Sequence, residues 1–518
     1  MYLLAHLVVG STAQVKKPDC AKAQPLLTRA QKSIDAKDSE AAIRDLSQAI
    51  EAAPRCADAY LLLGLAEFHN GATANAIENY QKALALDTRS YSAHYDLALA
   101  YLKEQKFEEA RAELEEAAKL DPTRADAIYN LGIVLQQTGQ PAQALLKFQR
   151  ARTLNPKQAD VAFNIVRTEL DLGHLAAART DAGDALARFG SDPQWCTAIG
   201  QLFVKAGHAK DAVPFLQRAV RSRPDDLDLR HQLAVAYLQV GQADKVLVTT
   251  SNPKTSDDYY LRASAYYLSH QFPDADMESQ KALELAPENP QILVLRTRLL
   301  QRAGNQNEAL AIAKKAIALA PDWDQPYYLA GVSSYLLRLY EESVKNLARA
   351  LELNPRSARA LFVQYIALAN LGRLEEAESS LRQAIALQPT NARLYCHLGI
   401  LMEREDKNKE AESLFRKAIQ LKPEYALSHY ELGKLLASFN NLRPATLQLE
   451  QAIQYDKGFS AAYYQLGRIY TKLGETQKSE RMLAEFKRLH SQDQQDPHDD
   501  QAHEDDAKQE TESNEHQF

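Results

Sequence analysis

The sequence predicts an all-α chain in which pairs of antiparallel helices stack on one another as a solenoid. Three observations support this prediction. The chain has a 34-residue period, each period holds two segments with apolar residues at three- and four-residue spacing, and a proline recurs near its end. Proline ends a helix because it lacks a backbone donor and clashes with the preceding turn. Stacked units of this kind bury a continuous core that one unit alone cannot form.

Prolines and small residues define the period. Pro287, Pro321, Pro355, Pro389 and Pro423 follow one another at equal intervals of one period. With the proline as the thirty-second position, the chain holds fourteen repeats, and twelve of the thirteen intervals between their first residues equal 34. The repeats start at residues 23, 57, 91, 125, 159, 193, 227, 256, 290, 324, 358, 392, 426 and 460. A glycine or alanine usually stands eighth, which indicates that two helices approach closely there.

The order of residues within a repeat resembles that of tetratricopeptide repeats. It runs Leu-Gly or Leu-Ala, then Tyr, Ala, an aromatic residue or Leu, Ala and Pro, and the close matches are YYQLGRIY (463–470) and NAIENYQKALALD (75–87). The resemblance covers residues 23 to about 490. It implies a right-handed superhelical solenoid whose concave face, formed by the first helices of the repeats, binds proteins or peptides.

One irregular interval suggests a division of the array. The interval between the repeat starts at 227 and 256 is five residues shorter than the others, so the second helix of that repeat is shortened and Ser251-Asn252-Pro253 stands at its end. We therefore divide the array into residues 23–255 (repeats 1–7) and 256–490 (repeats 8–14 with a polar terminal cap). A hinge and a shortened but rigid helix both remain open interpretations of this junction.

The amino-terminal residues 1–22 form a possible leader. They begin MYLLAHLVVGSTA, an apolar stretch followed by Ser11 and Ala13, which have the spacing of a signal-peptidase site. No Lys or Arg precedes the apolar stretch, however, and His6 interrupts it. The protein is therefore expected to be periplasmic or secreted if this segment is a signal peptide, and cytoplasmic otherwise.

The four cysteines are too widely spaced for a structural zinc site. Cys20 and Cys56 both lie near the start of the repeats and could form a disulfide if the protein meets an oxidising compartment. Cys196 and Cys396 are expected to be small buried residues.

The negative charge is concentrated at the carboxyl end. The chain has 61 Lys and Arg against 68 Asp and Glu, a formal charge of −7, yet residues 491–518 alone hold ten acidic residues and one Lys. This segment has too few apolar residues to fold and is predicted to be a disordered acidic tail. The remaining body is nearly neutral, which gives little electrostatic support for binding nucleic acid.

Sequence motifs of catalysis and cofactor binding are missing. The chain contains no GxxxxGK[ST], HExxH or GxSxG motif and no GxGxxG following a strand, and no apolar run approaches the roughly 18 to 20 residues that span a bilayer. We therefore predict a non-catalytic scaffold that binds proteins or peptides, with no cofactor, metal, nucleic acid or membrane span. The alternatives are an accessory subunit of an enzyme complex and, less favoured, an RNA-binding helical repeat.

The resemblance also nominates binding residues. It places the fifth residue of each first helix, and neighbours one turn away, on the concave face, where aromatic rings offer contact area at low entropic cost. The candidates are Tyr95, Tyr129, Asn130, Phe163, Asn164, Arg167, Tyr260, Tyr328, Phe362, Tyr430, Lys434, Tyr464 and Arg468. Rings at this position also serve packing in the family, so a ligand contact and a core contact both remain open for each.

Two further interpretations concern charged ligands. Arg404, Lys434, Arg468 and Lys472 fall in the last three repeats and could receive an acidic segment, although a solvated surface explains them as well. The clamp by which chaperone-binding members hold a terminal carboxylate requires Lys and Asn in one helix. Leu27 and Gln31 stand at those positions, so binding of a chaperone tail is not predicted.

Overall fold

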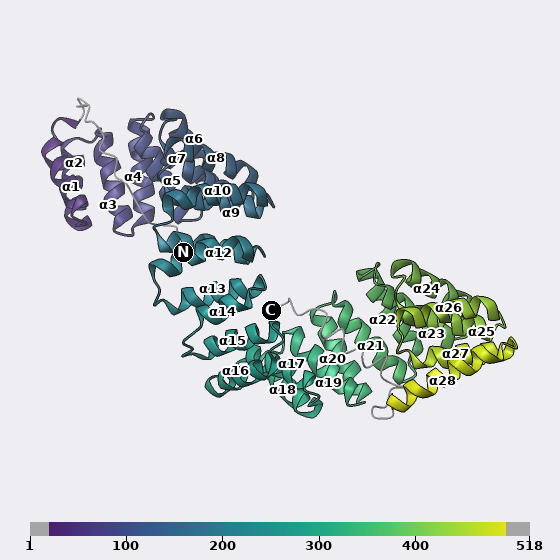
Figure 1. Ribbon diagram of the computed structural model, residues 1–518. Helices are drawn as coiled ribbons and strands as arrows, with labels where there is room; N and C mark the ends of the chain where they lie inside the picture. Colours follow the sequence, from purple (N-terminus) through teal and green to yellow (C-terminus); the bar gives the residue numbers. More distant parts are fainter. Residues whose placement is uncertain (1–19, 494–518) are drawn as a thin grey trace. The chain divides into compact units, whose positions relative to one another are not determined.

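The structure is a computed structural model that describes residues 20–493 (Figure 1). Its regular structure in that range consists of 28 α-helices, α1–α28, with no strand. The predicted all-α fold of helix pairs is confirmed. The predictions for the leader and the acidic tail concern residues that lie almost wholly outside the described range.

The helices alternate between the first and second helix of each repeat, and every first helix begins at, or one residue after, a predicted repeat start. The first helices are α1 (Gln24–Asp35), α3 (Ala57–His69), α5 (Tyr91–Lys103), α7 (Ala125–Gln137), α9 (Ala159–Asp171), α11 (Pro193–Lys205), α13 (Leu227–Gln239), α15 (Ser256–Leu268), α17 (Pro290–Arg302), α19 (Asp324–Leu336), α21 (Ala358–Asn370), α23 (Ala392–Arg404), α25 (Ala426–Ser438) and α27 (Ser460–Lys472). The second helices are α2 (Ser39–Ala52), α4 (Thr73–Leu86), α6 (Phe107–Leu120), α8 (Pro141–Leu154), α10 (Leu175–Phe189), α12 (Ala209–Ser222), α14 (Ala243–Thr249), α16 (Phe272–Leu285), α18 (Gln306–Leu319), α20 (Tyr340–Leu353), α22 (Leu374–Leu387), α24 (Asn408–Leu421), α26 (Leu442–Tyr455) and α28 (Thr476–Asp493).

Contacts between Cα atoms divide the chain into two compact units, residues 1–236 (unit 1) and 237–518 (unit 2). The boundary lies within α13, in the repeat with the shortened interval. Its second helix, α14, has 7 residues where most second helices have 14. The shortened helix predicted for this repeat is therefore present.

A small residue on the first helix meets a large residue on the second helix of the same pair. A Cβ added at Gly399 of α23 would lie 2.5 Å from a ring carbon of Phe415, which is fully buried on α24. Gly132 and Phe148 repeat this arrangement on α7 and α8, at the same sequence spacing as the first pair. The space left by the missing side chain is filled by the ring, which holds the two helices close together.

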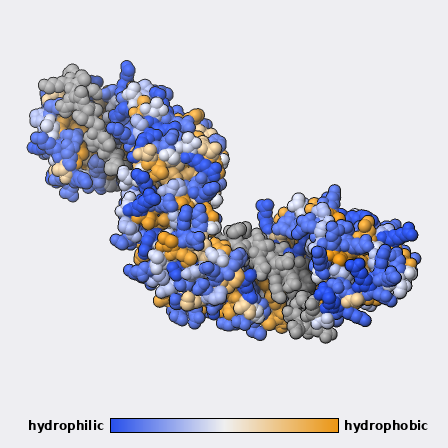
Figure 2. Space-filling view, viewed as in Figure 1, coloured by the Kyte–Doolittle hydropathy of each residue, from blue (hydrophilic) through white to orange (hydrophobic). Residues whose placement is uncertain are grey.

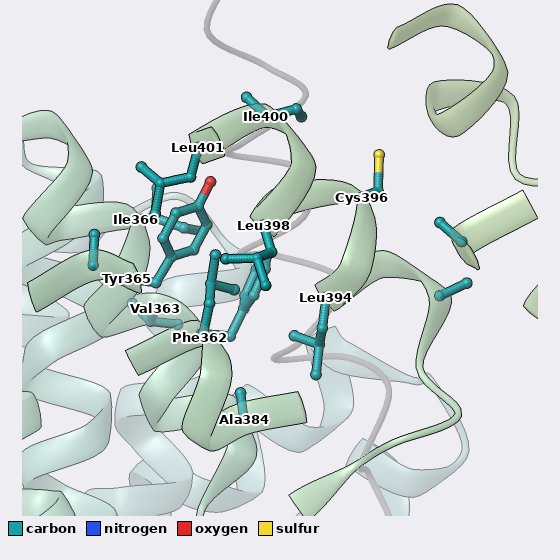
Figure 3. Packing of buried hydrophobic residues seen from close by; sticks show 14 of the residues in the cluster. Phe362, Val363, Tyr365, Ile366, Ala384, Leu394, Cys396, Leu398, Ile400 and Leu401 are labelled. Atoms are coloured by element: carbon teal, nitrogen blue, oxygen red, sulfur yellow. The ribbon is translucent and has the colours of Figure 1, made fainter. Parts of the chain in front are cut away.

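Packing between repeats completes the core. In unit 2, Phe362 of α21 lies beside Leu398 of α23 (Figure 3). The ring of Phe362 also contacts His397 at a centroid distance of 5.0 Å. These side chains are 0 to 1% exposed. Polar side chains cover most of the visible surface, with small groups of hydrophobic residues between them (Figure 2).

The turn inside every helix pair has one residue in the left-handed region of backbone conformation. It is the fifteenth residue of the repeat, and in eight repeats it is glycine, which adopts a positive φ without strain. The other six repeats have Lys37, Gln105, His270, Arg338, Asp406 and Asn440 at this position. The backbone of the turn is therefore kept in all fourteen repeats although the residue varies.

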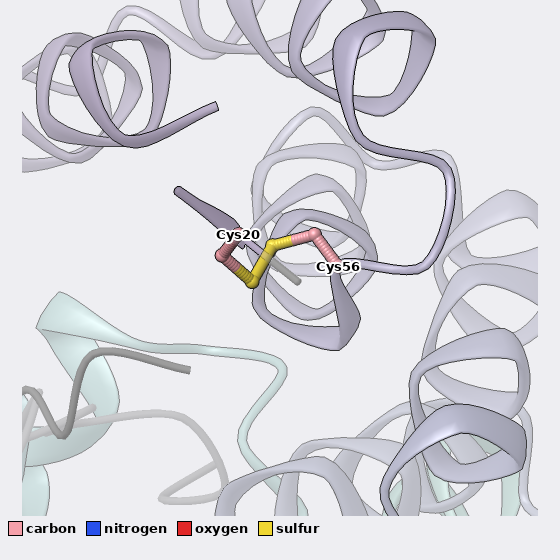
Figure 4. Close-up of a disulfide and its surroundings, with 2 residues drawn as sticks. All are labelled: Cys20 and Cys56. Carbon is pink, nitrogen blue, oxygen red and sulfur yellow. A yellow bond between two sulfur atoms is a disulfide. The ribbon is translucent and has the colours of Figure 1, made fainter. Parts of the chain in front are cut away.

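A disulfide joins Cys20 to Cys56 and ties the segment before α1 to the residue before α3 (Figure 4). Both cysteines are buried, and the bond encloses the whole first helix pair. Cys196 and Cys396 are free thiols and are buried as predicted.

In unit 1, a buried carboxyl group on α9 lies against a partly buried carboxyl group on α10. Glu169 of α9 is 2% exposed, and burial together with its hydrogen bond to Asp181 of α10 raises the pKa of Glu169 to about 8. Arg152 of α8 donates to Asp181 at 2.6 Å, so the charge of Asp181 is balanced. Glu169 therefore keeps its proton at neutral pH and donates it to Asp181.

Unit 1 is expected to lose stability as the pH rises through the pKa of Glu169. The folded-state pKa lies above the unfolded value, so the stabilisation is complete at low pH and is lost toward pH 8, by about 2 kcal/mol between pH 6 and pH 8. Glu169→Gln keeps the donor and removes the titration, so its thermal unfolding, followed by circular dichroism, should depend less on pH. Glu109→Gln, on the exposed face of α6, is the control. If the midpoint of thermal unfolding changed equally with pH in the wild type and in Glu169→Gln, this account would be contradicted.

Candidate functional site

The first helices of unit 1 present a row of tyrosines held by hydrogen bonds between neighbouring repeats. The amide of Asn130 on α7 donates to the hydroxyl of Tyr95 on α5 at 3.0 Å, and that of Asn164 on α9 donates to Tyr129 on α7 at 2.8 Å. Both rings are partly exposed, whereas Asn164 is buried at 5% exposure. Burial raises the pKa of Tyr129 to about 12, so its hydroxyl stays neutral. These bonds fix the orientation of each ring.

Charged groups surround the first ring of this row. Tyr91 stacks on Tyr95 with ring centroids 5.8 Å apart, and the guanidinium of Arg124 lies 4.0 Å from the centroid of Tyr91. Asp126 accepts hydrogen bonds from Tyr91 at 2.5 Å and from Arg124 at 2.6 Å. Next to Tyr95, burial raises the pKa of Asp96 to about 7. This end of the surface is rich in carboxylates.

The remaining candidates of unit 1 continue along the same helices. Phe163 is partly exposed on α9, and the guanidinium of Arg167 lies 5.8 Å from its ring centroid. Arg167 also donates to the side-chain oxygen of Gln136 on α7. Candidate residues on α5, α7 and α9 are thus brought together on one surface.

In unit 2 the candidate rings differ in exposure. Tyr260 is partly exposed, but Tyr328 and Phe362 are 3% and 0% exposed. The guanidinium of Arg359 lies 4.7 Å from the centroid of Tyr328, and that of Arg393 lies 4.5 Å from the centroid of Phe362. Both rings belong to the core because close packing of the first helices and these arginines cover them.

The last repeats expose aromatic rings again. Tyr464 of α27 is 40% exposed and packs on Phe486 of α28 at a centroid distance of 5.1 Å. Tyr430 is partly exposed and packs on Phe459 at 4.8 Å. The guanidinium of Arg468 lies 5.7 Å from the centroid of Tyr464.

Lys434 adds no net positive charge to this region. Its ammonium group pairs with Glu431 of the same helix and with Glu403 of α23, the latter at 3.3 Å. The group of Arg404, Lys434, Arg468 and Lys472 that was predicted to be basic therefore has less net positive charge than its sequence suggests.

The sequence analysis did not identify Arg359 and Arg393, the second residues of α21 and α23, as surface residues. Their spacing of exactly one repeat could have revealed them.

Within residues 20–493, no group of three or more His, Cys, Asp or Glu side chains is arranged to hold a metal ion. None of the helices in this range is both long and apolar enough to pass through a membrane.

Two curated proteins show similarity over part of their length. A protein STIP1 homolog of Dictyostelium discoideum is 28% identical over 106 residues, which is 20% of this chain and 19% of that protein. Hsp70-Hsp90 organizing protein 2 of Arabidopsis thaliana is 23% identical over 186 residues, or 34% of this chain and 31% of that protein. The chain thus aligns with less than a third of either relative.

Solved structures of low sequence identity also resemble the chain. The Cut9-Hcn1 hetero-tetramer of APC/C gives a TM-score of 0.43 at 14% identity, covering 87% of this chain and 97% of that chain. YrrB, described as a TPR protein with an unusual peptide-binding site, gives a TM-score of 0.32 at 24% identity. The alignment covers 36% of this chain and 96% of the YrrB chain.

Models of repeat families match segments throughout the chain. Two models described as tetratricopeptide repeat match 27–93, 129–194, 163–226, 392–425 and 460–489, and one described as TPR repeat matches 100–139 and 367–406. Together these segments cover more than half of the chain. The chain therefore belongs to the tetratricopeptide repeat family of protein-interaction scaffolds.

Proposed function

We propose that this scaffold binds partner proteins or peptides along the first-helix surfaces of its two units. The main support is the set of partly exposed rings held in place by a neighbouring helix, namely Tyr95 and Tyr129 by asparagine amides and Tyr464 by Phe486. A ring that is already immobilised loses little entropy when a partner packs on it. The name of one relative, an Hsp70-Hsp90 organizing protein, supports a role in bringing proteins together.

A chaperone tail is not the ligand that we propose. Leu27 and Gln31 occupy the clamp positions of α1, and Leu27 is buried. We also propose that the chain has no catalytic activity of its own. In support, the described helices all belong to repeats.

The rings of α25 and α27 are expected to contribute directly to binding. A library of phage-displayed random peptides would first be incubated with the Tyr430→Ala, Tyr464→Ala double variant, and the phage that bind it would be discarded. The remaining phage would then be selected for binding to the full wild-type chain. Enriched peptides should bind the wild type at least tenfold more tightly than the double variant, by fluorescence anisotropy, because two contact rings are lost. Circular dichroism should show retained helicity.

Tyr455 provides a matched control for this test. It is 42% exposed, nearly the same as the 40% of Tyr464, but it lies at the end of the second helix α26. Tyr455→Ala should change peptide affinity less than twofold. Failure to enrich any peptide, or equal losses in Tyr455→Ala and Tyr464→Ala, would count against binding on the first-helix surface of unit 2.

We further propose that the protein acts in an oxidising compartment. The bond between Cys20 and Cys56 supports this location, because disulfides rarely persist in a reducing cytosol. The apolar segment MYLLAHLVVG, which lies outside the described residues, is consistent with export.

A further inference from the structure

Three arginines lie on the first helices of unit 2, and we call them the arginine row: Arg298 of α17, Arg359 of α21 and Arg393 of α23. Arg359 and Arg393 are the second residues of their helices, and each guanidinium covers a buried ring of the preceding repeat, at 4.7 and 4.5 Å from the centroid. Arg298 donates to the side-chain oxygen of Gln325 on α19 at 3.0 Å.

Positive charge accumulates in this row. Burial lowers the pKa of Arg298, and the nearby positive charge of Arg359 lowers it further. Among the described residues, Arg359 forms no ion pair, and its guanidinium lies over the ring of Tyr328. Two guanidiniums that repel each other beside apolar rings form a favourable place for an anion.

The same register in unit 1 has the opposite charge. The second residues of α7 and α9 are Asp126 and Asp160, where α21 and α23 have Arg359 and Arg393. Asp126 is balanced by hydrogen bonds from Tyr91 and Arg124. Arginine at this register is therefore a feature of α21 and α23 in unit 2.

The chain itself contains an acidic segment that follows the last helix of unit 2. Residues 494–518 follow α28 and contain nine Asp or Glu and one Lys. The last turns of α28 pack on the amino-terminal half of α27, as shown by Phe486 against Tyr464 at 5.1 Å. The carboxyl end of α28, to which the segment is attached, therefore lies at the end of the helix pairs where the first helices begin. Arg359 and Arg393 lie near the starts of their first helices, at the same end.

The segment is long enough to reach the row. Residues 494–518 span about 80 Å when fully extended. The path from α27 to α21 crosses three repeats, and packed helices lie roughly 10 Å apart, so about 30 Å must be covered. Because the segment is covalently attached, its effective concentration near the row is high.

We propose that residues 494–518 dock on the arginine row and neutralise it within the same chain. Acidic segments of other proteins then compete with the chain's own tail for this surface. The docking goes beyond the proposed binding of partners and does not depend on it, since the tyrosine rings of α25 and α27 are not part of the row.

A peptide titration on full-length proteins tests this docking. The probe is a fluorescein-labelled synthetic peptide with the sequence of residues 494–518, titrated at about 50 mM salt. The tail-neutral chain, in which the nine acidic residues of 494–518 become Asn or Gln, should bind the probe at least tenfold more tightly than the wild type, because its own tail no longer competes. Adding Arg359→Gln and Arg393→Gln should remove this gain.

The control variant also replaces two arginines by glutamine, but on second helices of unit 2. Arg349 of α20 is partly exposed and pairs with Glu352, and Arg416 of α24 is exposed and pairs with Glu412. Arg349→Gln with Arg416→Gln in the tail-neutral chain should therefore leave probe affinity within twofold. If the Arg359, Arg393 double variant fails to fold, Arg359→Gln alone should weaken the probe about fivefold.

Three results would overturn the proposal. The first is that the probe does not bind the tail-neutral chain, and the second is that it binds the wild type and the tail-neutral chain equally well. The third is that the control variant loses as much affinity for the probe as the arginine-row variants. The Tyr430→Ala, Tyr464→Ala variant is expected to bind the probe normally in the tail-neutral chain. The two proposals can therefore fail independently.

Discussion

Replacing Cys20 and Cys56 by alanine is expected to destabilise the amino-terminal end of unit 1 by about 4 kcal/mol. The bond closes a loop with a sequence separation of 36 residues, and removing it restores the corresponding conformational freedom to the unfolded chain. Because each repeat contacts only its neighbours, the loss should be confined largely to α1, α2 and α3. Hydrogen exchange followed by mass spectrometry should show faster exchange there and unchanged exchange in unit 2.

Reduction provides an independent check on the disulfide. Wild-type protein treated with a phosphine reductant should show the same faster exchange in α1 and α2 as the double alanine variant. Unchanged exchange in both samples would mean that the first repeat is held by packing alone. In intact cells of the source organism, Cys20 and Cys56 should resist alkylation until reductant is added. Free thiols there would contradict the proposed oxidising compartment.

Gly132→Ala is expected to destabilise unit 1 by about 2 kcal/mol. The added methyl group would lie 2.6 Å from a ring carbon of Phe148, which is fully buried and has no space to move into. Overpacking of this kind forces helices apart or side chains out of their preferred rotamers. Urea unfolding should show a lower midpoint concentration, with little change in the dependence of the unfolding free energy on urea concentration.

The matched control for this change is Gly183→Ala on α10. No atom lies within 4 Å of the Cβ that this substitution would add. Gly183→Ala should therefore stabilise the helix by roughly 0.5 to 1 kcal/mol, since alanine has the higher helix propensity. Destabilisation by both substitutions to the same extent would show that contact with Phe148 is not the cause.

A compensating substitution should recover part of the loss. The preceding repeat has Ala98 with Leu114 at the positions of Gly132 and Phe148, and both are fully buried. Gly132→Ala with Phe148→Leu would reproduce that native pair. The double variant is expected to be more stable than the sum of the two single effects predicts, which a double-mutant cycle measures.

The architecture was predictable from the sequence because its signals are local and repeated. The 34-residue period located the first helices to within one residue, and the short interval at 227 identified the truncated helix α14. Small residues at the eighth position indicated the close contacts later seen between Gly399 and Phe415. Each of these features depends on residues within one repeat or its nearest neighbour, so periodicity alone reveals them.

The accessibility and charge of the candidate surface required the folded structure. Tyr95 and Phe362 stand at the same position of their repeats, yet Tyr95 is partly exposed and Phe362 is fully buried under Arg393. The sequence position of Lys434 suggests a basic surface, but Glu403 of another repeat lies beside Lys434 and balances its charge. Exposure and net charge depend on side chains brought together from different helices, and the repeat pattern does not specify those neighbours. Hence the period defines where the surface lies, while packing between repeats defines what a partner meets there.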